Sequence, residues 1–298
     1  MKSSGQNDLR TAFLSQLPAA AGNGAPPAWC DLVLPSDDGR PPVRLRCHQL
    51  ARADRGVLVW AHGGSWVGGS VEAWHEPCAA LAQASAMAVI SVEYRLAPRW
   101  PFPAPVEDLM HALRWAATTF GPASGQSPFL AVGGDSAGAT LAASAALRCR
   151  DEGPALAAQL LAYPPLDPSC SHPSYRRHPR CYPSRELMLD AWAAYRGPER
   201  GALADLPFTA WEAGDLSGLP PAIIGVGEHD PVAGDSLVFA ERLAAQGNAV
   251  SLRSFAGLGH GLFLHQAEDG SFPLQDWLAE QIHDHLPGQP ADDLRRQP

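Results

Sequence analysis

Charged residues are scarce in this chain, and basic residues are scarcer than acidic ones. Only 18% of the 298 residues are charged, whereas 46% are hydrophobic. This balance excludes a largely disordered chain and allows a substantial buried core. Lys and Arg together number 22 against 31 Asp and Glu, which gives a formal net charge of −9. A deficit of positive charge argues against nucleic acid or an anionic membrane as the main partner.

Paired-cysteine motifs and long apolar runs are also missing. The six cysteines are scattered with no Cys-x-x-Cys, which in a chain of this size favours free thiols and a reducing compartment. The apolar stretches near the N-terminus are interrupted by Ser15 and Gln16, so no signal peptide is predicted. No apolar run reaches membrane-spanning length. We therefore expect a cytoplasmic protein without a membrane span.

What the chain does contain is an alternation of short apolar runs with helix-like segments. The clearest helical spacing extends from Val106 to Phe120, and Pro105 suits the first turn of that helix. Alternating strands and helices predict one α/β domain with a mainly parallel central sheet and helices on both faces. The runs predict strands over residues 43–49, 57–61, 88–93, 129–133, 158–163, 222–226 and 250–255.

Two stretches do not follow the alternation. Residues 1–42 have Gly and Pro breakers and are expected to be irregular. Residues 164–221 are rich in Pro and Arg, with one helical patch at 185–195 and no convincing strand. Long connections in compact domains tend to be functional, so we expect these stretches to form a lid and not a plain surface excursion. The polar tail at 287–298 is expected to be disordered.

The central motif is Gly134-Asp135-Ser136-Ala137-Gly138, which lies between an apolar run and an alanine-rich helix. A Gly-x-Ser-x-Gly between strand and helix is the nucleophile elbow of α/β hydrolases. Side chains at Gly134 or Gly138 would strike the neighbouring strand or helix, so both positions require glycine. The pattern alone arises by chance in about one chain of this length in ten. Other parts of a serine hydrolase must therefore be found.

A serine nucleophile needs a base and an acid that orients the base, and both should follow it in the chain. His260 stands between glycines just after the last predicted strand, while His265 lies further into the following segment. Asp230 comes just after a strand end, where α/β sheets collect functional groups. Glu228 and Asp235 are alternatives, although Asp235 fits better as an N-cap or first-turn residue of the next helix. We predict Asp230 and His260 as the partners of the nucleophile.

Attack on an acyl carbonyl creates an oxyanion that needs fixed hydrogen-bond donors. The backbone N–H of Ala137, directly after the nucleophile, is one candidate. Gly63, Gly64 and Ser65 follow a predicted strand and supply further backbone donors, because successive glycines let the loop approach a ligand closely. Alone this segment would be a plain Gly-rich turn. Its position ahead of the elbow favours an oxyanion hole.

Together these motifs resemble the hormone-sensitive-lipase-like esterases, the bacterial family IV carboxylesterases. The resemblance implies an α/β-hydrolase fold with a helical lid, a triad of Ser136, Asp230 and His260, and no cofactor or metal. It also implies a small ester substrate with a short acyl group and an acyl-enzyme intermediate. The oligomeric state is not predicted, and a homodimer is possible. It covers roughly residues 55–265 through His62-Gly63-Gly64-Ser65, Tyr94-Arg95-Leu96-Ala97-Pro98, the intact elbow, Asp230-Pro231-Val232 and His260-Gly261-Leu262.

The chain departs from the family pattern in two places. Ser65 replaces the third glycine of the oxyanion loop, so the N–H is kept but a hydroxymethyl group enters the site. Gly234 stands where relatives often have an aspartate. The pattern His-Gly-Gly-x-Trp also resembles kynurenine formamidases, so an amidase or formamidase using the same triad is an alternative. The related plant gibberellin receptors lack the catalytic histidine, so the presence of His260 disfavours a receptor.

One further cluster contains potential metal ligands. Two cysteines and two histidines can bind zinc, and such a set lies within the expected lid. Its spacing matches no common structural-zinc pattern, and no metal is predicted. The residues are Cys170, His172, His178 and Cys181.

Overall fold

The computed structural model describes residues 28–35, 40–121, 129–198 and 207–285. Its centre is an eight-stranded sheet in the order β1-β2-β4-β3-β5-β6-β7-β8. The pairings β1–β2 and β2–β4 are antiparallel and the others are parallel. The mainly parallel sheet is thus confirmed, and every predicted strand is present. The strands are β1 (Trp29–Leu34), β2 (Val43–His48), β3 (Val57–Ala61), β4 (Ala88–Glu93), β5 (Leu130–Asp135), β6 (Ala158–Ala162), β7 (Ala222–Gly227) and β8 (Val250–Phe255).

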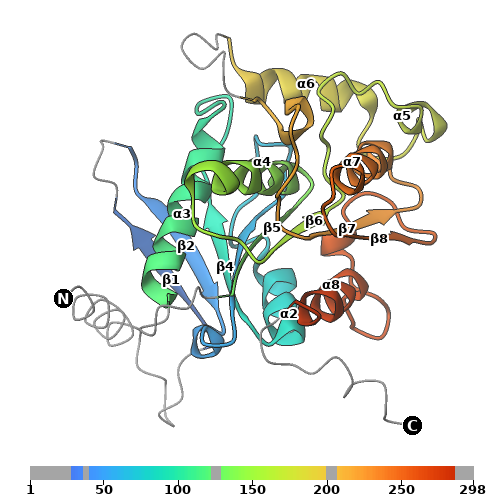
Figure 1. Cartoon of the computed structure of the whole chain (residues 1–298). Coiled ribbons are helices and arrows are strands. Elements are labelled where there is room, and N and C mark those ends of the chain that lie inside the picture. Colours follow the sequence, from blue (N-terminus) through green and yellow to red (C-terminus); the bar gives the residue numbers. More distant parts are fainter. Residues whose placement is uncertain (1–27, 36–39, 122–128, 199–206, 286–298) are drawn as a thin grey trace.

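Helices cover both faces of the sheet (Figure 1). On one face are α3 (Ala104–Phe120), α4 (Ala137–Glu152) and α7 (Ala233–Ala245), and on the other are α2 (His75–Ser85) and α8 (Pro273–His283). The predicted helix at 106–120 is α3, with a proline in its first turn. Short 3-10 turns are η1 (Leu50–Arg52), η3 (Ala210–Glu212) and η4 (Leu262–Leu264).

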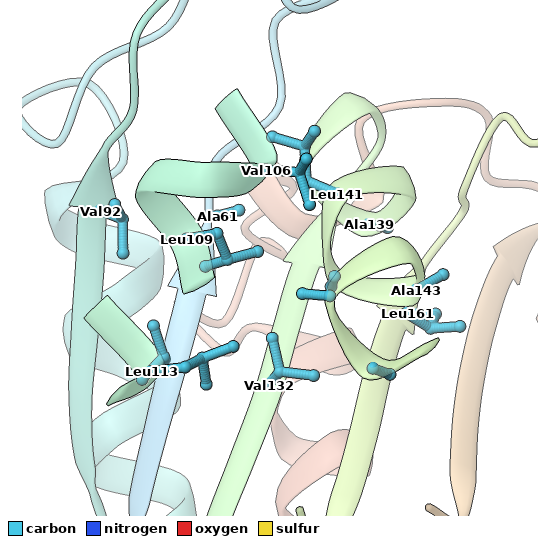
Figure 2. Close-up of a cluster of buried hydrophobic side chains, with 14 of the residues drawn as sticks. Ala61, Val92, Val106, Leu109, Leu113, Val132, Ala139, Leu141, Ala143 and Leu161 are labelled. Atoms are coloured by element: carbon cyan, nitrogen blue, oxygen red, sulfur yellow. The ribbon is translucent and has the colours of Figure 1, made fainter. Parts of the chain in front are cut away.

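The core beneath α3 and α4 fixes the helix that follows the nucleophile. Figure 2 shows α3 and α4 side by side above the strands, with their aliphatic side chains directed between them and toward the sheet. Helix α4 is buried along most of its length, and its many alanines let its backbone lie close to both the sheet and α3. The cluster includes Val106, Leu109, Leu113, Ala139, Leu141 and Ala143 from the helices and Ala61, Val92, Val132 and Leu161 from the strands.

The expectation that residues 1–42 are irregular is wrong for residues 29–34, which form the edge strand β1. Cys30 and Leu34 are buried in the core while intervening residues are more exposed. Register places Asp31 opposite Arg46 of β2, and Arg46 Nε lies 2.7 Å from Asp31 Oδ1. This pairing joins residues that are distant along the chain, so no local pattern reveals it. Residues 1–27, which belong to the predicted lid, and the predicted tail at 287–298 lie outside the described residues.

Residues 164–221, called the lid segment below, contain α5 (Ser174–Arg177), α6 (Arg185–Arg196) and η3. The predicted helical patch at 185–195 is α6, which is drawn at the opposite end of the molecule from α2 and α8 (Figure 1). Its Trp192 and Tyr195 pack on Trp66, with ring centroids 4.1 and 4.9 Å away. Because Trp66 directly follows Ser65, this contact places the lid segment against the loop predicted to hold the oxyanion.

Candidate active site

The elbow is a single strained residue between two regular elements. Strand β5 ends at Asp135 and helix α4 begins at Ala137, which leaves Ser136 at φ 51° and ψ −122°. A positive φ is unfavourable for a side chain other than glycine and is maintained only by the surrounding structure. Here the Ser136 N–H donates to Ala162 O at 2.9 Å, which ties the turn to β6. The serine is thereby presented at the carboxyl edge of the sheet.

Two glycines make the sharp turn sterically feasible, as predicted. A Cβ placed on Gly134 would collide with the backbone of Gly138, and one placed on Gly138 would collide with the carbonyl of Ala61. Neither contact involves a flexible side-chain end, so the backbone itself would have to move. The requirement for glycine at both positions is one of space.

Gly138→Ala is therefore expected to lower the free energy of unfolding by about 3 kcal/mol and to reduce ester hydrolysis, because β3 and the elbow must separate. Urea unfolding monitored by tryptophan fluorescence and the specific activity of the folded variant measure both effects. Gly214→Ala is the matched control, since nothing lies within 4 Å of its Cβ position. A Gly138→Ala protein as stable and active as the parent would contradict the steric argument.

Three side chains from different loops meet at this edge. Ser136 Oγ lies 2.8 Å from His260 Nε2, and His260 Nδ1 lies 2.9 Å from Asp230 Oδ2. Asp230 follows β7 and His260 follows β8, while Ser136 follows β5. The carboxyl ends of parallel strands share one edge of the sheet, which explains why the three converge. The Asp230 carboxylate is fully buried and also accepts the N–H of Val232 at 2.9 Å.

The alternative residues occupy other places. His265 is exposed beyond η4. Glu228 is exposed and accepts the N–H of Gly257 at 2.8 Å. Asp235 lies in the first turn of α7, as the sequence predicts. Its carboxylate accepts the hydroxyl of Tyr175 at 3.0 Å and backbone N–H groups of the lid segment. Burial raises the pKa of Asp235 to about 7. None of the three is bonded to His260.

The loop after β3, which is predicted to hold the oxyanion, has three consecutive residues in an unusual backbone conformation. Gly64, Ser65 and Trp66 all have positive φ, at 119°, 56° and 61°, and a Cβ on Gly64 would strike Gly68 O. Among the hydrogen bonds of the described residues, none uses the N–H of Gly64, Ser65 or Ala137. The absence of a protein acceptor in these ranges is what the predicted oxyanion donors require. Ser65 keeps its N–H but carries a side chain at a φ that glycine adopts more easily.

Gly63, the fourth predicted donor, has a different function in the loop. Its N–H donates to Asp135 Oδ1 at 3.1 Å, so it is already occupied. The neighbouring His62 ring is buried, with Nδ1 2.7 Å from Gly63 O. Burial lowers the pKa of His62 to about 4, which keeps the ring neutral near pH 7. Tyr94 donates its hydroxyl to His62 O at 2.8 Å. The start of the loop is thus held by protein contacts.

Tyr163 and Asp135 also surround the site, although no motif predicts a function for either side chain. Tyr163, one residue beyond β6, donates its hydroxyl to Asp135 Oδ2 at 3.2 Å. Its ring meets that of His260 edge-on, with centroids 4.9 Å apart. Both Tyr163 and Asp135 stand at the carboxyl ends of adjacent parallel strands. That position was the available sequence signal, because such strand ends collect functional groups.

The Cys/His cluster of the lid segment does not form a metal site. No three of its members, nor any other three potential ligands in the described ranges, are close enough to hold an ion. His172 Nδ1 instead lies 2.9 Å from Ser174 Oγ, and its ring fills the space that a Cβ on Gly234 would need. This packing accounts for glycine at position 234. All six cysteines are free, as predicted.

Comparison with known proteins then decides the family. Residues 58–264 match the family described as alpha/beta hydrolase fold. The chain belongs to this family. The carboxylesterase NlhH of Mycobacterium tuberculosis is 39% identical over 226 residues, covering 74% of this chain and 70% of the relative. The ethyl acetate hydrolase of Pseudomonas putida is 32% identical over 267 residues, covering 86% and 84%. The resemblance to hormone-sensitive-lipase-like carboxylesterases is thereby confirmed.

Solved structures agree with this assignment. A hyperthermophilic esterase from Pyrobaculum calidifontis superposes with a TM-score of 0.76 at 29% identity, covering 95% of this chain and 94% of that one. The esterase LipW of Mycobacterium marinum gives 0.74 at 32% identity, covering 94% and 88%. The predicted α/β-hydrolase fold is confirmed. None of the helices in the described ranges combines the length and apolar character needed to cross a bilayer.

Proposed function

We propose that this hydrolase cleaves carboxylic esters of small molecules through an acyl-enzyme formed on Ser136. The observation that carries the proposal is the continuous contact from Ser136 Oγ to His260 Nε2 at 2.8 Å and from His260 Nδ1 to Asp230 Oδ2 at 2.9 Å. A hydroxyl bonded to an imidazole, which is in turn oriented by a buried carboxylate, is the arrangement that activates a serine nucleophile. The esterase relatives support ester bonds as the target.

In acylation, Ser136 Oγ transfers its proton to His260 Nε2 as it attacks the carbonyl carbon. The Nδ1–H of His260 donates to Asp230, which stabilises the imidazolium that forms. The carbonyl oxygen becomes an oxyanion and accepts the N–H groups of Gly64, Ser65 and Ala137. Collapse of the tetrahedral intermediate breaks the ester C–O bond, and His260 Nε2 protonates the departing alcohol.

Deacylation uses the same groups in reverse order. His260 takes a proton from water, whose oxygen attacks the acyl carbon held on Ser136. The oxyanion again accepts hydrogen bonds from the three amide N–H groups. The bond between the acyl carbon and Ser136 Oγ then breaks as His260 returns a proton to Ser136 Oγ. The free acid is released. Each proton transfer in this cycle takes place at His260 Nε2, so Asp230 orients the imidazole and takes no proton itself.

A short acyl group is part of the proposal. The lid segment packs on the oxyanion loop through Trp192 and Tyr195, which supports a covered site. Tyr182, also in the lid segment, stands with its ring centroid 5.8 Å from that of His260 and is 62% exposed. An aromatic ring beside the histidine suits a small apolar group. The cytoplasmic location and the homodimer considered from sequence remain parts of the proposal.

Hydrolysis of p-nitrophenyl acetate, butyrate, octanoate and palmitate tests the acyl preference. We expect kcat/KM to be highest for acetate or butyrate and to fall for the longer esters. A matched p-nitroanilide measures the amidase or formamidase alternative and should react at least about 10²-fold more slowly, because the amine leaves less readily than the phenol and the relatives are esterases. A maximum at palmitate would contradict the short-acyl assignment, and faster anilide cleavage would favour the amidase.

A phosphonate ester tests the covalent step directly. Its phosphorus should become bonded to Ser136 Oγ with loss of the leaving group, which leaves a stable analogue of the tetrahedral intermediate. Peptide mass spectrometry should find the added mass on the peptide that contains Ser136. Labelling of another residue with equal loss of activity would count against the proposed nucleophile.

A further inference from the structure

A buried carboxylate with no counter-ion lies directly before the nucleophile. Asp135 is 2% exposed and forms no ion pair in the described part of the chain. Its two oxygens accept four hydrogen bonds, from Gly63 N (3.1 Å), Trp60 Nε1 (3.2 Å), Trp74 Nε1 (2.9 Å) and Tyr163 OH (3.2 Å). The proposed mechanism uses none of these contacts. A buried charge is costly unless it is well bonded, so its presence calls for an explanation.

The chemistry of the donors shows that the site is built for a carboxylate. A backbone N–H and two indole N–H groups can only donate, and all three point at Oδ1. One amide oxygen or hydroxyl has fewer acceptor positions than an ionised carboxyl group. Burial raises the pKa of Asp135 to about 7, and the four donors oppose that rise.

One oxygen of Asp135 holds the oxyanion loop. Oδ1 bonds to the N–H of Gly63, the residue immediately before the free donors Gly64 and Ser65. The approach is so close that a Cβ on Gly63 would lie 2.6 Å from Asp135 Oδ2 and 3.3 Å from Ser136 Cβ. The loop therefore rests on the elbow itself. A shift of this contact would displace the oxyanion donors relative to the nucleophile.

The other oxygen of Asp135 is linked through Tyr163 to the loop that carries His260, which we call the His260 loop. Oδ2 accepts the hydroxyl of Tyr163, and that hydroxyl accepts the N–H of Phe263 at 3.0 Å. Phe263 lies three residues after His260, and its ring stacks on Trp60 with centroids 4.4 Å apart. Trp60 in turn donates to Asp135. The contacts close a ring that joins the elbow to the turn carrying His260.

We propose that Asp135 is a positioning residue for ester hydrolysis, which fixes the oxyanion loop through Oδ1 and the His260 loop through Tyr163. It touches neither substrate nor the transferred proton. Its contribution is to keep the donors of Gly64 and Ser65 and the imidazole of His260 at fixed positions around Ser136. Small displacements of catalytic groups can cost about 10²-fold in rate. The inference rests on the proposed function of Ser136 and His260.

Asp135→Asn is the first test. The amide oxygen can still accept from Gly63 and the two indoles, but the NH₂ group faces the Tyr163 hydroxyl, whose own hydrogen then loses its acceptor. We expect kcat for p-nitrophenyl butyrate to fall about 10- to 100-fold while KM stays within about threefold. Tyr163→Phe removes only the hydroxyl that joins Asp135 to Phe263 and should lower kcat in the same direction.

Two readouts separate positioning from a merely structural contribution. The double variant Asp135→Asn/Tyr163→Phe should cost little more than Asp135→Asn alone, because both changes break one network. The downfield proton resonance of the His260 Nδ1–H bonded to Asp230 should shift or broaden in both single variants. Asp108→Asn is the control: this carboxylate is equally buried, at 2% exposure, but bonds to Arg95, away from the nucleophile. It should lower the melting temperature without changing kcat in the folded protein.

Unchanged kcat in folded Asp135→Asn or in Tyr163→Phe would overturn the inference, as would fully additive losses in the double variant. If Asp135→Asn fails to fold, Tyr163→Phe and the proton resonance still decide the question. Failure of the proposed function gives a different result, because Ser136→Ala would then retain ester hydrolysis. Loss of activity in Ser136→Ala together with normal Asp135→Asn would contradict only the positioning assignment.

Discussion

Ser136→Ala is expected to lower kcat for p-nitrophenyl butyrate by about 10⁶-fold. The substitution removes the only atom of the elbow that can form the acyl bond, and the oxyanion donors remain but have no covalent intermediate to stabilise. The fold should survive, because alanine at position 136 keeps the backbone and loses one hydroxyl that bonds to His260 at 2.8 Å. Stopped assays with purified protein and circular dichroism measure the two expectations.

Ser144→Ala is the matched control for this prediction. Ser144 lies two turns further along α4 and is buried, and its Oγ has no hydrogen-bond partner among the residues that the structure describes. Its removal should leave kcat within about twofold, since surface and unbonded groups contribute little. Before the assay, the phosphonate inactivates any contaminating serine esterase. If Ser136→Ala then still retains more than about 1% of kcat, the proposed nucleophile is refuted.

Asp230→Asn should have the second largest effect, a loss of about 10⁴-fold in kcat. The amide nitrogen can donate to His260 Nδ1 and so favours the tautomer with its hydrogen on Nε2, which cannot accept the serine proton. The buried position of Asp230 prevents water from substituting for the lost charge. The loss should appear in kcat more than in KM, because the charge acts on the imidazolium of the transition state.

Glu228→Gln provides the comparison, because Glu228 was the other acidic residue at the same strand end. It is exposed and bonds to Gly257, so kcat should stay within about twofold. A larger loss in Glu228→Gln than in Asp230→Asn would show that the orienting acid is assigned to the wrong residue.

The consequences of the Asp135 network extend beyond one residue. Loops that bring catalytic groups together must be rigid if the oxyanion donors are to be preorganised. In this chain Asp135 of the elbow accepts the N–H of Gly63 in the predicted oxyanion loop directly, and it is linked to Phe263, three residues after His260, through the hydroxyl of Tyr163. The lid segment contacts the same loop from outside through Trp66.

Local patterns along the chain determined much of the architecture. Apolar runs predicted β2 to β8, helical spacing predicted α3, and the motif around Ser136 predicted an elbow with two required glycines. These features depend on interactions between near neighbours in sequence, or on the burial of one continuous segment, so periodicity and glycine placement suffice to indicate them. The choice of Asp230 and His260 as candidates also came from their positions after strands.

Other features were decided by contacts between distant residues. Strand β1 pairs along its whole length with β2, buries Cys30 and Leu34, and places Asp31 against Arg44 and Arg46. The N–H of Gly63 donates to Asp135, 72 positions away in sequence. The hydroxyl of Tyr163 accepts the N–H of Phe263, 100 positions away. Hydrogen-bond partners at such separations depend on how the packed sheet brings strand ends together. The sequence by itself therefore determined which chemical groups are present and on which elements, and the tertiary structure decided which of those groups are free to act.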